Sequence, residues 1–395
     1  MNSRETSIGR MLTLDAMRGG AALAVVTYHA LGVAPRTAMS GWEAWLPQIA
    51  SYTVHFAFAG IYLFFVISGF CIHLFWAKGR AAGVLEPTIN FFTFWKRRVR
   101  RLYPPYFAAL ALYLCYLAYK TPVHVTGAYV WDVLLHVFML HNLDLKTTYT
   151  INGAFWTLAI EEQLYLAYFL LLFLRIRYGW TRTLLLCLSA RVVWLIMAHV
   201  LSASVGVYIP VTEAAATNWF IWALGALSVE AALGVTKLPA WCFKLSTAGL
   251  ALGCAMALAQ FLPLVDQKGW IHDIGWLAMH PAWGVGFFIL VNYAVAAEQR
   301  WRLRSLPVPR LIPALASVGL ISYSLYLTHS FVIMHWYWFG FTRFHILTIA
   351  LVIMVPLSVA FAWLFFRICE RPFMTSITTK ARAKSVSAAL AREVA

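Results

Sequence analysis

The sequence predicts an all-α polytopic membrane protein of about ten transmembrane helices with both termini in the cytoplasm. Hydrophobic residues make up 62% of the 395 residues and charged residues 12%, whereas soluble domains average about 45–50% and about 25%. So few charges could not cover the surface of a soluble fold. The 18 Trp, 18 Tyr and 27 Phe exclude a disordered chain, so the lipid bilayer is the expected environment.

The individual spans follow from the apolar segments. A bilayer core of about 30 Å requires roughly 20 mostly apolar residues per helix. Residues 128–142 include Trp131, Asp132, His136 and His141, and this mixture predicts an interfacial helix or packed loop instead of a span. Ten other segments satisfy the requirement: 14–33, 57–76, 104–120, 155–175, 183–203, 217–235, 245–264, 274–296, 315–338 and 346–368.

The net charge of +16 is explained by membrane topology, and no nucleic-acid partner is expected. If the N-terminus is inside, alternate loops should be rich in Lys and Arg. Most of the 31 basic residues do fall in the predicted cytoplasmic segments or at the adjoining helix ends, beside the anionic lipid surface. Arg191 lies within a span, and the predicted outside loops hold Arg36, Lys120, Lys146, Lys268 and Arg343.

Cysteine and histidine patterns predict neither a disulfide framework nor a metal site. The 6 cysteines lie in or near apolar segments without a CxxC pair, and the 12 histidines show no HExxH-type cluster. The first apolar run lacks an A-x-A cleavage site, so we expect a retained helix there instead of a signal peptide.

The first span carries two ionisable residues, Arg18 and His29. Eleven residues are just over three helical turns, so both side chains lie on nearly the same face, about 16 Å apart along the axis. Charges inside a membrane are default candidates for function. The alternative is that Arg18 is a cytoplasmic anchor and His29 a packing residue.

The fourth span carries adjacent carboxylates, Glu161 and Glu162, with Tyr165 within reach of either. Neighbouring helical residues diverge by about 100°, so at least one carboxylate should face the bundle interior. A buried acid beside a histidine could orient its ring, as in a catalytic triad. The alternative is that both acids lie at the water interface.

A basic run, KRRVRR at residues 96–101, lies between the second and third spans. Guanidinium groups match phosphate oxygens, so the run could bind phosphates, or it could anchor the third helix. Pro104 and Pro105 suit the start of that helix. In the second span Ser68-Gly69 favours close helix packing, and Ser68 could also supply a hydroxyl to a site.

Further polar residues lie in other spans. Tyr323, Tyr326 and His329 recur every three residues, so they form one stripe that either lines a cavity or bonds neighbouring helices. Arg191 and Glu230 are in-span charges to which the sequence assigns no chemistry.

Together these segments resemble the acyltransferase 3 family of membrane O-acyltransferases. The chain matches, in family order, the first-helix motif with an Arg and a His separated by ten residues, the second-helix signature, the R-R-x-x-R loop, the W-S-L-x-x-E-Q-x-Y block and two C-terminal blocks. Thr157 replaces the usual Ser, and Tyr168 and Phe169 lie where a proline is common. The matching segments are LDAMRGGAALAVVTYH, FFVISGF, KRRVRRLYP, FWTLAIEEQLY, SYSLYLTH and ICERPF.

The resemblance implies an acyltransferase-like transmembrane domain at residues 1–373, followed by a short basic cytoplasmic tail at 374–395. It implies transfer of an acyl group, most commonly acetyl, from acyl-CoA to a hydroxyl of a carbohydrate or glycolipid acceptor such as a surface polysaccharide. No tightly bound cofactor is expected, and the expected location is the bacterial inner membrane. The sequence does not predict the oligomeric state.

The resemblance also implies catalytic roles. His29 would be the base that takes the acceptor proton, and Glu161 or Glu162 would orient it. Arg18 would hold a CoA phosphate or stabilise the thioester oxyanion.

Substrate binding would fall to Arg97, Arg98 and Arg101 through the nucleotide phosphates, with Ser68 and Tyr165 in secondary roles. Two other functions stay open from the residues. One is acylation of a lipid or macrolide acceptor, and the other is proton-coupled transport of a small solute.

Overall fold

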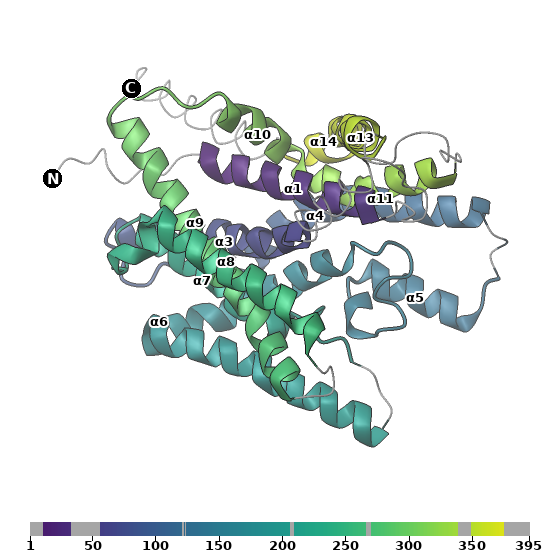
Figure 1. Ribbon diagram of the computed structural model, residues 1–395, viewed down its shortest axis with the longest axis horizontal. Coiled ribbons are helices and arrows are strands. Elements are labelled where there is room, and N and C mark those ends of the chain that lie inside the picture. The colour runs from purple at the N-terminus through teal and green to yellow at the C-terminus, as the bar shows by residue number, and fades with distance from the viewer. Residues whose placement is uncertain are drawn as a thin grey trace, which may run out of the picture.

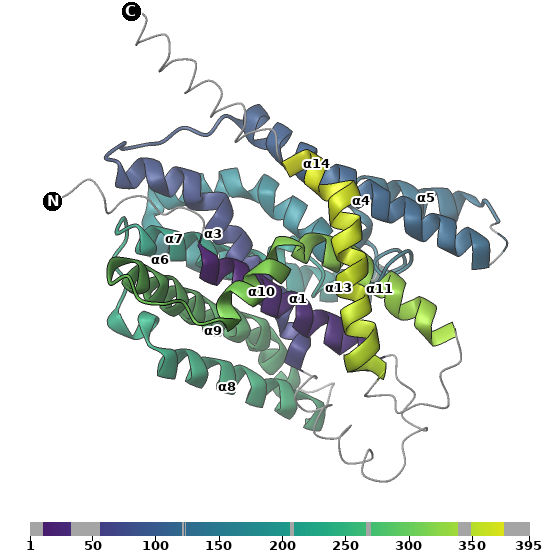
Figure 2. The same cartoon turned by 90° about the horizontal axis from the view of Figure 1, so that it is seen from above.

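The computed structural model describes residues 11–32, 56–120, 122, 124–205, 209–265, 270–338 and 349–374. Throughout these residues the regular structure is helical, and the long helices form one bundle (Figures 1 and 2). The longer helices are α1 Leu12–Gly32, α3 Gly60–Ala81, α4 Phe91–Lys120, α5 Gly127–Val137, α6 Trp156–Val205, α7 Ala215–Ala232, α8 Leu245–Phe261, α9 Trp270–Leu303, α10 Leu311–Leu320, α11 Ser322–Trp338 and α13 Val355–Phe365. Short elements are η3 Phe56–Ala59, η4 His141–Leu143, η5 Ala240–Phe243, η6 Leu262–Leu264, η7 Ile349–Met354, η8 Phe366–Glu370 and α14 Arg371–Met374.

The described part of each predicted span is largely helical, but fewer helices qualify as membrane spans. Six described helices are long and apolar enough to cross a membrane, or seven if α10 and α11, bent by 74° at their junction, form one span. Two predicted spans merge in α6, which is broken at Gly179 (φ 74°). The count of ten and the cytoplasmic termini stay predictions, and the basic tail beyond residue 374 lies outside the described residues.

Helix α4 begins earlier than the sequence predicted. It starts at Phe91, so the basic run of residues 96–101 is helical and Pro104 and Pro105 lie inside the helix. The start signal is Asn90, whose side-chain oxygen accepts the backbone N–H of Thr93 at 2.9 Å and caps the first turn. The prediction that the prolines begin this helix is therefore wrong. Proline is tolerated inside membrane helices where neighbours satisfy the freed backbone groups.

The start of α1 is fixed by a carboxylate of another helix. Glu298 of α9 accepts the backbone N–H groups of Leu12 and Thr13 at 2.9 and 2.7 Å, and the Thr13 hydroxyl at 2.6 Å. Arg302 donates to the same carboxylate at 2.5 Å. A negative group at a helix N-terminus satisfies unpaired N–H donors and favours the helix dipole, so α9 sets the position of α1.

Helices α3 and α7 cross in backbone contact. A Cβ added at Gly69 would lie 2.0 Å from the carbonyl oxygen of Trp222, and one added at Gly225 would lie 1.9 Å from that of Val66. Only glycine fits so close a crossing. The prediction that the Ser68-Gly69 pair permits close helix packing is confirmed.

The segment expected to be interfacial contains α5 and η4, and α5 is not among the helices that could span a membrane. Thr126 caps α5 by accepting the N–H of Tyr129 at 3.2 Å. The Tyr106 hydroxyl of α4 donates to the carbonyl oxygen of His136 at 2.7 Å. This short helix therefore packs against α4 near one end of the bundle (Figure 2).

Candidate functional site

A cavity of about 150 Å³ lies among α1, α3, α4, α6, α10 and α11, and Glu370 of η8 completes its wall. These elements come from both ends of the described chain, and Figure 2 shows α1 beside α10 and α11. Six of the predicted site residues line the cavity: Arg18, Ser68, Arg98, Arg101, Glu161 and Tyr165.

Glu161 lines the cavity, where two hydroxyl groups hold it. Ser68 donates to its Oε1 at 2.5 Å and Tyr165 donates to the same oxygen at 2.6 Å. Ser68 in turn accepts the indole N–H of Trp222 at 3.2 Å, which fixes the direction of its own hydrogen. The carboxylate is therefore a fixed acceptor in a part-buried site.

Glu162 points elsewhere, as the 100° divergence of neighbouring helical residues requires. It is buried and accepts the Tyr103 hydroxyl at 3.0 Å. Within the described residues, neither Glu161 nor Glu162 has a hydrogen bond to His29. That one of them orients His29 stays a prediction, which no hydrogen bond among the described residues supports.

Arg18 lines the same cavity and joins α1 to α3. Its guanidinium lies 3.5 Å from the Asp15 carboxylate, and it donates to the Cys71 sulfur at 2.9 Å. Arg18 is part-buried, with 26% of its side chain exposed, so the charge is both supported by the protein and open to the cavity.

Arg98 and Arg101 extend the positive charge along α4. The Arg98 guanidinium lies over the rings of Phe94 and Tyr165 at 5.5 and 5.8 Å, in cation–π geometry. Its buried Nε atom has no hydrogen-bond partner within the described chain. Arg101 is exposed at the edge of the cavity, whereas Arg97 is exposed and does not line it. Arg97 thus lies outside the cavity lining, and its part in phosphate binding stays a prediction.

His29 pairs with another histidine. Its Nδ1 atom lies 2.9 Å from Nε2 of His329 in α11, and the two rings stack with centroids 5.0 Å apart. The structure thus places His329, instead of a glutamate, where the orienting partner was expected. The reason is that α1 packs on α11 at this level, whereas Glu161 of α6 faces Ser68 of α3.

The polar stripe of α11 divides between two roles. Tyr323 and Tyr326 line the cavity, and Tyr326 also accepts the Thr157 hydroxyl at 2.6 Å. The Tyr326 ring lies 5.7 Å from the His329 ring. Tyr326 therefore contacts both the cavity and the histidine pair.

The cavity-lining residues to which the sequence assigned no role include Cys71 and Glu370. Glu370 accepts the Ser324 hydroxyl at 2.5 Å. An acid at the end of the last apolar segment is a signal that could have identified it. Cys71 lies three residues after Ser68, so the two share a helix face. A cysteine within an apolar run, however, does not by itself indicate a functional site.

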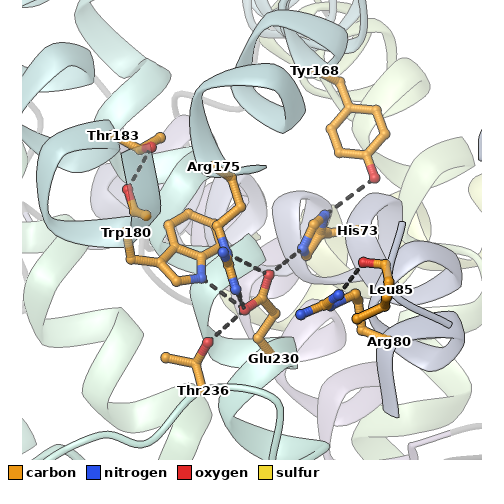
Figure 3. A network of polar contacts seen from close by, with 10 residues as sticks. His73, Arg80, Leu85, Tyr168, Arg175, Trp180, Thr183, Glu230 and Thr236 are labelled. Atoms are coloured by element: carbon orange, nitrogen blue, oxygen red, sulfur yellow. Dashed lines mark hydrogen bonds and ion pairs between the residues drawn. The ribbon is translucent and has the colours of Figure 1, made fainter. Parts of the chain in front are cut away.

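Glu230, an in-span charge without assigned chemistry, lies at the centre of a separate buried network (Figure 3). Its carboxylate accepts from Arg175 at 2.8 Å, from the Trp180 indole at 2.8 Å and from Thr236 at 2.5 Å. His73 of α3 lies 3.0 Å from it. The network ties α3 and α7 to both sides of the Gly179 break in α6, and a charge so fully satisfied is structural.

Arg191 is also structural. Its guanidinium donates to the backbone carbonyl oxygens of Leu277, Thr217 and Trp276 at 3.0, 3.0 and 3.2 Å. These contacts hold α6 against α7 and α9, which explains a completely buried arginine outside the cavity.

His136 and His141 stack in the segment beside α4, with ring centroids 3.9 Å apart. Burial, together with the neighbouring His136, lowers the pKa of His141 to about 3. The His141 ring is therefore neutral at physiological pH and acts as a packing group. Among the described residues, no group of three or more His, Cys, Asp or Glu side chains could hold a metal ion.

Comparison with known protein families identifies the family of this chain. A family model described as an acyltransferase domain matches residues 11–367. No curated protein and no solved structure matches the chain.

Proposed function

The chain belongs to the acyltransferase 3 family and is a membrane acyltransferase, and from that premise we propose its reaction. It moves an acyl group, acetyl in the simplest case, from acyl-CoA to a hydroxyl of a carbohydrate acceptor such as a surface polysaccharide. We place this multi-pass protein in the bacterial inner membrane, with the basic end of the cavity toward the cytoplasmic donor.

The observation that carries the proposal is the positive charge gathered in one cavity. Arg18, Arg98 and Arg101 come from two helices far apart in the sequence and line the same space. Arg98 carries a buried N–H that lacks a partner in the described residues. Buried donors are normally satisfied, so this one favours an anionic ligand, and a guanidinium suits the phosphates of CoA.

The acyl group has a short path from these arginines to the base. Arg18 and His29 share one face of α1, about 16 Å apart along its axis. The thin pantetheine arm of CoA is long enough to extend from the arginines past Tyr326 to the histidine pair. We therefore favour direct transfer over an acyl-enzyme intermediate.

The chemistry at His29 is general base catalysis. The acceptor oxygen attacks the thioester carbonyl carbon, the carbon–sulfur bond breaks, and CoA leaves as a thiolate. His29 takes the proton of the acceptor hydroxyl and passes it to the departing thiolate, so no proton is left over. Glu161 does not act on His29 in this scheme; its carboxylate holds Ser68 and Tyr165 in place and balances the cavity arginines.

The test uses protein purified in detergent with radiolabelled acetyl-CoA, following CoA release and label transfer to glycan. His29→Ala should reduce turnover by about 10²–10⁴-fold, the range contributed by a general base. His199→Ala is the matched control, because His199 is exposed on α6. Turnover by His29→Ala equal to that of the wild type would exclude His29 as the base. Label transferred to lipid in place of glycan would change the acceptor class, and uptake of a solute without CoA release would favour a transporter.

A further inference from the structure

The backbone contacts of His329 decide which nitrogen donates in the hydrogen bond between His29 and His329. Its Nδ1 atom lies 2.8 Å from the carbonyl oxygen of Tyr326 and 3.1 Å from that of Leu325. Carbonyl oxygens only accept hydrogen bonds, so Nδ1 of His329 must carry a hydrogen.

The other nitrogen of His329 must then be the acceptor. A ring with hydrogens on both nitrogens would be a cation, and His329 is completely buried. Within the described residues its hydrogen bonds go to backbone carbonyls, His29 and the Ser330 hydroxyl, and none goes to a carboxylate. An unpaired buried charge is costly. His329 is therefore neutral, with a lone pair on Nε2.

This assignment fixes the hydrogen on His29. Its Nδ1 atom is 2.9 Å from the Nε2 lone pair of His329, so Nδ1 of His29 must be the donor. In neutral His29 the remaining nitrogen, Nε2, then carries a lone pair. The Ser330 hydroxyl, at 3.2 Å, is the more distant neighbour of the same His329 nitrogen, and its rotating hydrogen can share that lone pair.

We infer that His329 is a positioning residue that holds His29 in the tautomer with Nδ1–H and a basic Nε2. The inference rests on the proposed function for its catalytic meaning. The arrangement has the logic of a catalytic triad, in which the orienting group fixes the tautomer of the base. Here two backbone carbonyls and a neutral imidazole take the place of a carboxylate.

A neutral orienting group has a chemical consequence. It leaves no negative charge beside His29, so a polar ring can orient the base without placing an unpaired carboxylate in the membrane interior. His29 keeps its Nδ1 hydrogen bond both before and after Nε2 takes a proton, so the ring does not need to turn during the reaction.

The direct test is ¹⁵N NMR of histidine-labelled protein in detergent, with the His29 signals assigned by their loss in His29→Gln. In the wild type, Nδ1 of His29 should be protonated and Nε2 unprotonated. In His329→Phe, which keeps a ring but lacks the acceptor, His29 should shift toward the Nε2–H tautomer. In His329→Gln, whose side-chain oxygen can accept from His29, the Nδ1–H tautomer should persist.

His335→Phe is the matched control. His335 lies on the same helix and also donates Nδ1–H to a backbone carbonyl, that of Phe331 at 3.1 Å, but its ring packs on Tyr116. This variant should leave the tautomer of His29 unchanged. An Nε2–H tautomer in wild-type His29, or an unchanged tautomer in folded His329→Phe, would overturn the inference.

Kinetics then connect the tautomer to the reaction. His329→Phe should reduce kcat by about 10²-fold, at the lower end of the contribution of a general base, while KM for acetyl-CoA stays unchanged. His329→Gln should restore most of kcat. The NMR result decides the role of His329 even if acetyl-CoA is not turned over, whereas absence of turnover in the wild type counts against the proposed donor and function.

Discussion

At the residue scale, Glu161 and Glu162 show how one position along a helix separates two environments. Glu161 binds two hydroxyl groups at the cavity, whereas Glu162 is turned to Tyr103 of α4. The same divergence of neighbouring helical residues separates Arg97 from Arg98 in the basic run of α4. Adjacent residues of identical type are therefore the natural matched controls for this site.

Arg98 gives the sharpest prediction at this scale. Arg98→Gln should raise KM for acetyl-CoA by about 10- to 100-fold, because hydrogen bonds to charged groups contribute about 1.5–3 kcal/mol. Arg97→Gln, at an exposed position outside the cavity, should leave KM unchanged. Initial rates over a range of acetyl-CoA concentrations measure both. Equal effects of the two substitutions would mean that the cavity is not the donor site.

At the element scale, the α3–α7 crossing presents Ser68 to Glu161. Ser68 precedes Gly69, and the Trp222 that contacts Gly69 through its backbone also donates its indole N–H to Ser68. Packing and site are therefore built from the same helical turn.

Gly225→Ala should consequently destabilise the protein by about 1–3 kcal/mol or more, the usual cost of overpacking, because the added methyl group would overlap the Val66 carbonyl. Gly253→Ala on α8 is the control, since the space beside Gly253 is open, and it should be neutral or slightly stabilising. Thermal unfolding in detergent measures both. A Gly225→Ala protein as stable as the wild type would show that the two helices can move apart.

The elements themselves were largely predictable from hydropathy, whereas their ends and partners were not. The apolar segments gave the helices, and the mixed composition of residues 128–142 gave α5. The start of α4 was missed because Asn90 is a weaker helix-start signal than the pair Pro104-Pro105, which lies inside the helix. The partner of His29 was missed because the packing of α1 on α11 brings together residues 300 positions apart, and no local pattern encodes that contact.

At the scale of the whole molecule, the Glu230 network joins α7 to two helices that also carry cavity residues, α3 and α6. Its members come from α3, α6, α7 and the segment after α7. Because it lies apart from the cavity lining, it supports the fold and takes no part in the proposed reaction.

Glu230→Leu should therefore lower the free energy of unfolding by about 3–5 kcal/mol, the cost of leaving a buried charge unpaired. The double variant Arg175→Leu/Glu230→Leu should recover part of this loss, because it removes both charges. Arg177→Leu, at an exposed site two residues away, is the control. Denaturation of the wild type, the Arg175→Leu and Glu230→Leu single variants and the double variant gives a double-mutant cycle. Simple additivity of the two single losses would contradict the coupling.

The cavity wall runs from Arg18 near one end of the chain to Glu370 near the other. Almost the entire domain must therefore be synthesised and inserted into the membrane before the cavity wall is complete. During synthesis the partly inserted protein would have its first helix, with Arg18 and His29, but neither His329 nor Glu370. If this cavity is the active site, we expect the enzyme to be inactive while it is being made. We also expect a chain truncated before its last helices to be inert instead of an acyltransferase with altered specificity.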